Sequence, residues 1–155
     1  SRNPLAHSLS IRYHINRTSV LIQLLLEDGC MTCIPEKDRD IIELAIYLPM
    51  VLTVLNRDLT IIETSPFKLK RPYVEWIQKT MFIIQQELSE VTQFLRKNNI
   101  KVTQVKNDEA FTLYLFLYKE YEEYHNYFNP RIRNKVEELM KHYLYERLGE
   151  YPNQT

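Results

Sequence analysis

Glycine is nearly absent from this chain: its 155 residues include only Gly29 and Gly149. Tight hairpin turns and phosphate-binding loops usually need glycine, because glycine adopts a positive φ without steric cost. The composition therefore favours helices joined by short connections, and it excludes the glycine-rich nucleotide-binding motifs. We predict an all-α fold, a small helical bundle of four to five helices.

Prolines and the spacing of apolar residues divide the chain into helical segments. Pro35, Pro72 and Pro130 stand where a first helical turn tolerates proline. Pro49 lies inside the first segment, where we expect it to kink the helix. Asn98-Asn99 can supply the left-handed residue that ends the second segment. The predicted helices span residues 35–64, 72–97, 110–128 and 130–148, and residues 100–106 form an extended connector or a lone short strand.

The first 33 residues differ from the rest. Residues 9–16 alternate apolar and polar side chains like a strand, but they have no evident partner strand. A purine-rich stretch resembling a bacterial ribosome-binding site, followed by ATG, can encode Leu26 to Met31. We therefore hypothesise that the native chain starts at Met31. The expected organisation is a poorly structured leader at 1–33, non-native or disordered, a helical domain at 34–148 and a tail at 149–155.

Charge and cysteine content restrict the setting of the protein. Twenty basic residues balance twenty acidic ones, so no overall field attracts nucleic acid or an anionic membrane. The apolar run 41–55 contains Glu43 and Pro49, which predicts a buried core helix rather than a membrane span. Cys30 and Cys33 lack a second ligand pair, so we expect two reduced thiols in a cytoplasmic protein. From the neutral charge and the interrupted apolar run we expect no membrane partner.

Acidic and histidine side chains suggest a metal site as one alternative. Glu122 and His125 would share a face of the predicted helix, and Glu-x-x-His is half of what a di-iron carboxylate bundle uses. Glu43 lies in an apolar stripe. We expect it at the edge of that stripe, because a buried carboxylate needs a partner or a shifted pKa. The candidate transition-metal ligands are Glu43, Glu122, His125, Glu138 and His142. The competing interpretation is a solvated helix face without a cofactor.

Basic residues near aromatic ones suggest phosphate or nucleic-acid binding as a second alternative. The candidates lie at two predicted helix starts and are Lys68, Lys70, Arg71, Arg131 and Arg133. Helix N-termini bind phosphate, and arginine beside aromatic residues is typical of nucleic-acid-binding surfaces. The zero net charge and the lack of a recognition-helix pattern argue against this function. Solvated loops are the competing interpretation.

Tyrosine is abundant, with eleven in the chain, and many aromatic residues lie between residues 110 and 128. They cover more than one stripe of the predicted helix, so that helix is either central or in contact with a partner chain. The candidate interface residues are Tyr114, Tyr118, Tyr121, Tyr124 and Phe128. Motifs for nucleophilic or metalloprotease catalysis are absent. We therefore expect a non-enzymatic interaction or regulatory protein that self-associates, as a dimer, or binds another protein.

Three segments resemble a known bacterial family. They are IPEKDRDIIELAIYLP at residues 34–49, PFKLKRP at 66–72 and YHNYFNP at 124–130. All three are similar to the small YhjD-like proteins of Bacillus and its relatives, and the resemblance covers about Met31 to Leu148. It implies a bacterial cytoplasmic setting, and it assigns no catalytic residue.

Overall fold

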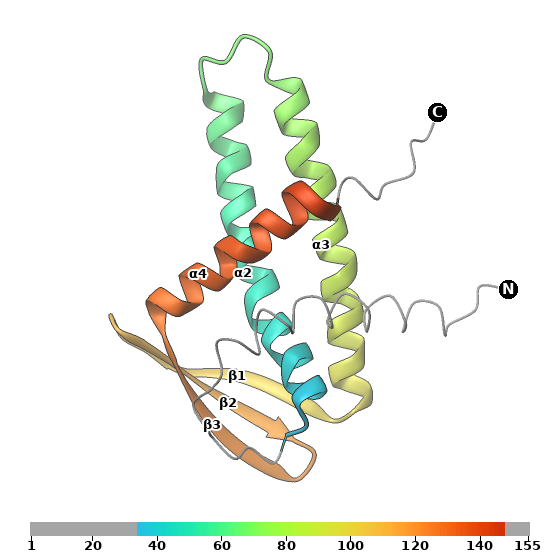
Figure 1. The fold of residues 1–155 in the computed structure, drawn as a ribbon, viewed down its shortest axis with the longest axis vertical. Helices are drawn as coiled ribbons and strands as arrows, with labels where there is room; N and C mark the ends of the chain where they lie inside the picture. Colours follow the sequence, from blue (N-terminus) through green and yellow to red (C-terminus); the bar gives the residue numbers. More distant parts are fainter. Residues whose placement is uncertain (1–33, 148–155) are drawn as a thin grey trace, which may run out of the picture.

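The computed structural model describes residues 34–147. This part of the chain folds into a long helical hairpin, a three-stranded sheet below it and a further helix that crosses the hairpin obliquely (Figure 1). In chain order the elements are α2 (Glu36–Thr64), α3 (Arg71–Lys97), β1 (Ile100–Asn107), β2 (Phe111–Tyr118), β3 (Tyr121–Phe128), α4 (Asn129–Lys141) and the short π-helical segment η1 (His142–Glu146).

The helical hairpin follows the signals in the sequence closely. α2 begins after Pro35, whose carbonyl accepts hydrogen bonds from the Asp38 and Arg39 amides at 3.0 Å. It runs through Pro49 without a break, and the kink expected there stays a prediction. α3 carries Pro72 in its first turn, and Arg96 and Lys97 in its last turn complement the helix dipole.

The sheet corrects the predicted fold class. β1, β2 and β3 form an antiparallel meander in that order, so the fold is α+β, and the prediction of an all-α bundle of four to five helices is wrong. The predicted aromatic helix at 110–128 is a β-hairpin, β2 and β3, joined by Lys119 and Glu120. Residues 100–106, for which a strand was one of two expectations, belong to β1.

The turns of this sheet form without glycine. Lys119 adopts a positive φ of 57° between β2 and β3, and Asn99 adopts 54° before β1. In the connection between β1 and β2, the Asp108 carboxylate accepts hydrogen bonds from the Ala110 and Phe111 amides at 2.9 and 2.8 Å. A side chain thus replaces the missing turn residue. Scarcity of glycine consequently did not exclude a hairpin.

One face of the sheet and the helices enclose a single core. Phe116 at the centre of β2 is fully buried, together with Ile42 and Val51 of α2 and Ile84 and Val91 of α3. Each such side chain stabilises the fold by about 1.5–3 kcal/mol. α2 is long and apolar enough to cross a membrane by length and composition, but the core helix of a soluble protein passes the same test.

Some sequence-based expectations lie outside the described residues. They are the leader at 1–33, the start at Met31, the thiols Cys30 and Cys33 and the tail at 149–155.

Candidate functional site

The face of the sheet that points away from the helices is largely apolar. Side chains alternate between the two faces of a strand, so the even-numbered residues of β2 point into the core and the odd-numbered ones point outward. Leu113, Leu115 and Leu117 therefore form a half-exposed stripe along β2. Beside them on β3, Tyr124 and Phe128 are 62% and 48% exposed. We call this surface the outer face.

Opposite charges flank one end of the leucine stripe. The strand register pairs Leu117 with Lys101 on β1 and with Glu122 on β3, so the three side chains form one row across the outer face. Lys101 and Glu122 are both exposed. The row therefore places a positive charge on one side of an apolar centre and a negative charge on the other.

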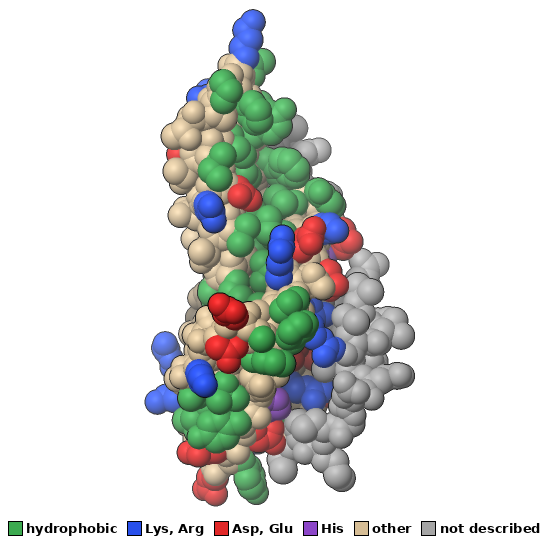
Figure 2. Space-filling model, turned by 90° about the vertical axis from the view of Figure 1, so that its left-hand side faces the viewer, with side chains coloured by type: hydrophobic (Ala, Val, Ile, Leu, Met, Phe, Trp, Pro, Cys, Tyr) green, Lys and Arg blue, Asp and Glu red, His purple; other side chains and the backbone are tan. Residues whose placement is uncertain are grey.

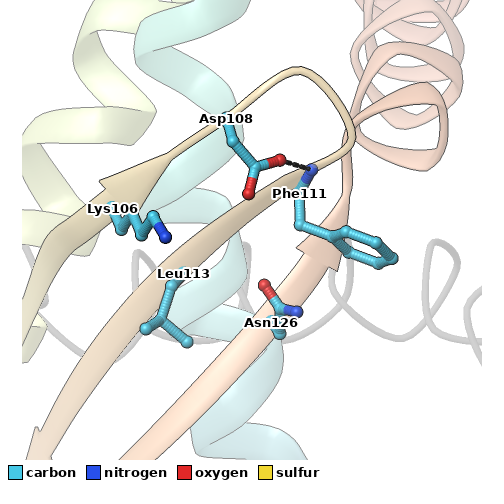
Figure 3. A pocket seen from close by; sticks show the side chains of 5 residues that line it. All are labelled: Lys106, Asp108, Phe111, Leu113 and Asn126. Atoms are coloured by element: carbon cyan, nitrogen blue, oxygen red, sulfur yellow. Dashed lines mark hydrogen bonds between the residues drawn. The ribbon is translucent and has the colours of Figure 1, made fainter.

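The other end of the outer face is hollowed (Figure 3). The hollow has a volume of about 270 Å³ and is lined by Lys106, Asp108, Phe111, Leu113 and Asn126. The backbone hydrogen bonds that Asp108 Oδ1 accepts from Phe111 and Ala110 lower the pKa of Asp108, so this carboxylate stays charged. A ligand would meet an apolar floor with one ammonium group, one amide group and one carboxylate at its edge, which suits a protein side chain.

The predicted interface residues divide between the two faces. Tyr114 and Tyr118 are buried against the helices, and the Tyr118 hydroxyl donates to Asp38, a bond that raises the pKa of Tyr118 to about 12. Tyr124 and Phe128 lie on the outer face, and Tyr121 is exposed beside the β2–β3 turn.

Sequence reasoning missed the outer leucines and Lys101. The signal that could have found them is the run FTLYLFLY at residues 111–118, a length typical of a strand with two apolar faces. It stands two residues before a segment of equal length, a spacing typical of a hairpin.

A buried polar cluster lies where α2, α4 and β3 meet. Asp40 is only 5% exposed, and Glu43 is only 6% exposed. The position predicted for Glu43 was the edge of the apolar stripe. Burial, followed by the charges of Glu43 and Glu36, raises the pKa of Asp40 to about 6. Burial also raises the pKa of Glu43, which accepts a hydrogen bond from the Tyr127 hydroxyl at 3.1 Å.

This cluster holds elements together. The positive charge of Lys135 on α4 lowers the pKa of both carboxyls, while its ammonium group lies 3.6 Å from Glu138. Tyr127 connects β3 to α2 through its hydrogen bond to Glu43, and Lys135 of α4 supplies a positive charge near both carboxyls. We interpret the cluster as a buried contact between α2, β3 and α4.

The structure separates the candidate metal ligands. Glu122 and His125 are three residues apart on a strand, so they lie on opposite faces of the sheet, and His125 contacts Glu123 at 3.0 Å instead. Glu138 lies near Lys135, and His142 contacts Glu146 at 2.8 Å. Within residues 34–147, no group of three or more His, Cys, Asp or Glu side chains is arranged to hold a metal ion.

The candidate phosphate-binding residues also fall into two distant places. Lys68, Lys70 and Arg71 lie at the end of the α2–α3 hairpin, whereas Arg131 and Arg133 lie in the first turns of α4 near the sheet (Figure 1). They do not form one basic surface.

Comparisons with known proteins agree with the resemblance seen in the sequence. The sequence model of the family described as "YhjD protein" matches residues 33–148. The chain is 49% identical over 115 residues to the "Uncharacterized protein YhjD" of Bacillus subtilis (strain 168), which covers 74% of this chain and 96% of that protein. No solved structure matches the chain significantly. From its match over most of its length, the chain belongs to the YhjD family.

Proposed function

We propose that this protein is a non-enzymatic interaction protein that self-associates through the outer face of its sheet. The observation that carries the proposal is the row Lys101, Leu117 and Glu122, whose charges are opposite on the two sides of an apolar centre. Two such faces are complementary to each other when they pack with the leucine stripes in contact.

The geometry of that packing follows from symmetry. A two-fold axis between the two sheets and parallel to β2 places β1 of each copy opposite β3 of the other. Lys101 of one copy then faces Glu122 of its partner at the same level, and the contact is formed twice. Sheets that pack face to face keep their strands within about 30° of each other, which this arrangement satisfies.

The apolar content of the face supports the same conclusion. Its exposed large side chains include Phe111, Tyr124 and Phe128, which adjoin the leucine stripe rather than standing singly. The free edge of β1 is a poor alternative, because a bulge between Gln104 and Lys106 interrupts its pairing pattern. Face-to-face contact is therefore favoured over edge-to-edge pairing.

Charge reversal tests the proposal. We expect Glu122→Lys and Lys101→Glu each to weaken the dimer about tenfold or more, because two attractive contacts become repulsive. The double variant Lys101→Glu with Glu122→Lys should restore association, since the charges are exchanged. Size-exclusion chromatography with light scattering over a concentration series measures this, with Lys79→Glu on the exposed side of α3 as the control.

A central substitution completes the test. Leu115→Glu places a charge in the middle of the apolar stripe and should give a monomer, which near-ultraviolet circular dichroism can show to be folded. A wild-type chain that stays monomeric at high concentration contradicts the proposal. Failure of the double charge exchange to restore association contradicts the proposed two-fold axis.

A further inference from the structure

The tip of the α2–α3 hairpin is both apolar and basic. It lies at one end of the long axis of the molecule, far from the sheet (Figure 1). Leu69 is 75% exposed and Phe67 is 51% exposed, and the Phe67 and Tyr73 rings pack at a centroid distance of 5.6 Å. Residues 65–71 contain three basic side chains, Lys68, Lys70 and Arg71, and no acidic one.

The apolar surface continues from the tip along the hairpin. Ile61 on α2 and Trp76 on α3 are exposed and line an apolar groove of about 290 Å³, which extends to the end of α4. Figure 2 shows hydrophobic side chains gathered over the upper end of the molecule, where the hairpin lies, with a lysine or arginine side chain at the very top. Within residues 34–147, α4 and η1 contribute Met140 and Leu144 to this groove, while Ile61 and the tip residues Phe67 and Leu69 stay exposed.

We propose that this tip docks on a membrane surface of anionic lipids. Phe67, Leu69 and Tyr73 would enter the boundary between headgroups and acyl chains, where aromatic residues are favoured. Lys68 and Arg71 would lie at the level of the phosphates. The zero net charge of the chain predicts no membrane partner, but the local charge of a protruding loop is what a membrane surface meets.

The contacts within the tip keep it in shape for this role. The Lys70 ammonium donates to the Glu63 carbonyl at 2.9 Å, which ties the loop to the last turn of α2. Arg71 pairs with Glu75 at 2.9 Å, and both side chains remain well exposed. The exposed leucine and phenylalanine are therefore held on an ordered loop, so that little ordering is needed on binding. Phe67 and Tyr73 offer rings on which a base could stack, but Leu69 and Ile61, the most exposed apolar side chains of this surface, are aliphatic and favour contact with acyl chains over bases.

The single tryptophan of the chain gives a direct readout. Trp76 lies one turn below Tyr73 and is 39% exposed, so its fluorescence should shift to shorter wavelength when the tip enters lipid. We expect the full chain to float with vesicles of phosphatidylcholine mixed with phosphatidylglycerol at low salt, and to be released at high salt. It should not float with vesicles of phosphatidylcholine alone.

Two variants separate the apolar and electrostatic contributions. Lys68→Gln with Arg71→Gln should weaken binding about 25-fold, since each basic residue near an anionic surface contributes roughly fivefold. Leu69→Ser should reduce both flotation and the fluorescence shift. The double variant Lys79→Gln with Lys141→Gln removes the same amount of positive charge away from the tip. Phe82→Ser removes an exposed apolar side chain of α3, also away from the tip. Both controls should bind like the wild type.

Three outcomes overturn the proposal. The first is no flotation with anionic vesicles at low salt, and the second is equal flotation with both kinds of vesicle. The third is retention on single-stranded DNA that depends on Lys68 and Arg71 in a protein that does not float, which would assign the tip to nucleic acid.

Discussion

At the scale of single residues, the enclosure of Asp40 makes stability depend on pH. Its pKa is about 6 in the folded protein against an ordinary value of 3.8. As the pH rises from about 4 to about 6, the unfolded chain releases this proton before the folded protein does, so the free energy of unfolding falls. Above about pH 6 the destabilisation is complete, and burial of the ionised carboxylate is its main cause.

Asp40→Asn should remove this dependence. We expect the variant to be more stable than the wild type by about 1–3 kcal/mol at pH 8, with the difference closing toward pH 4. Urea unfolding at the two pH values measures it. An equal difference at both pH values would show that ionisation of Asp40 is not the cause.

Asp108→Asn provides a contrast of opposite sign. Backbone hydrogen bonds lower the pKa of Asp108, so its charge stabilises the fold above the ordinary pKa, and that contribution is lost as the pH falls through the lowered pKa. The asparagine variant should therefore be less stable than the wild type at pH 8.

Single residues also show what the sequence could predict. The left-handed conformation predicted for Asn98-Asn99 is confirmed at Asn99. The burial of Glu43 was not predicted, because its hydrogen-bond donor, Tyr127, lies 84 residues away in the sequence. A local sequence pattern cannot identify a partner that is so distant along the chain. Lys135 of α4 is similarly remote from Glu43 in the sequence, so its nearby charge was not predicted either.

At the scale of elements, η1 is attached to α3 by the partly buried carboxylate of Glu87. The Tyr143 hydroxyl and the Arg147 guanidinium both donate to Glu87, the latter at 2.7 Å. Tyr143→Phe should lower the free energy of unfolding by about 1.5–3 kcal/mol, because a hydrogen bond from the buried Tyr143 hydroxyl to a charged group is lost. Tyr145→Phe, at a neighbouring position that is 67% exposed, should change it by less than about 0.5 kcal/mol. Equal effects of the two substitutions in thermal melts would contradict this account.

The β2–β3 turn is strained at one position. Lys119 has a φ of 57°, a conformation that costs residues other than glycine roughly 1–2 kcal/mol. Lys119→Gly should therefore stabilise the protein by about 0.5–1 kcal/mol, after the greater freedom of glycine in the unfolded chain is deducted. Urea unfolding measures the difference.

Glu120→Gly is the matched control in the same turn. Glu120 does not have a positive φ, so glycine there gains nothing in the folded state and should destabilise the protein by a similar amount. A destabilised Lys119→Gly variant would show that the cation–π contact of the Lys119 ammonium, 5.2 Å from the centroid of the Tyr118 ring, outweighs the strain.

The elements also show why one helix was predicted in place of two strands. α2 and α3 are long, begin near proline and repeat their apolar residues every three or four positions, so local signals define them. Strands β2 and β3 have eight residues each, and β2 carries apolar side chains on both of its faces. Position 119 between them holds lysine instead of the glycine that would mark a turn, so the sequence of the two strands resembles that of one continuous aromatic helix.

At the scale of the whole molecule, the two proposed surfaces lie at opposite ends. The outer face belongs to the sheet, and the lipid-binding tip is the far end of the α2–α3 hairpin (Figure 1). A dimer formed by the sheets therefore leaves both tips exposed. The two tips then point in opposite directions, so a flat membrane meets only one tip of each dimer, and charge reversal at Glu122 should leave flotation with anionic vesicles nearly unchanged.

The described part of the chain contains one continuous hydrophobic core. Side chains from α2, α3, β1, β2, α4 and η1 form one buried cluster, and the family match ends within one residue of the same segment. We therefore predict that a chain of residues 34–148 folds cooperatively, with a melting temperature close to that of the full chain. Circular dichroism during heating of both chains measures this. A shortened chain that binds hydrophobic dyes and melts without cooperativity would show instead that residues 1–33 supply part of the core, and that the stability of the helical hairpin and sheet depends on them.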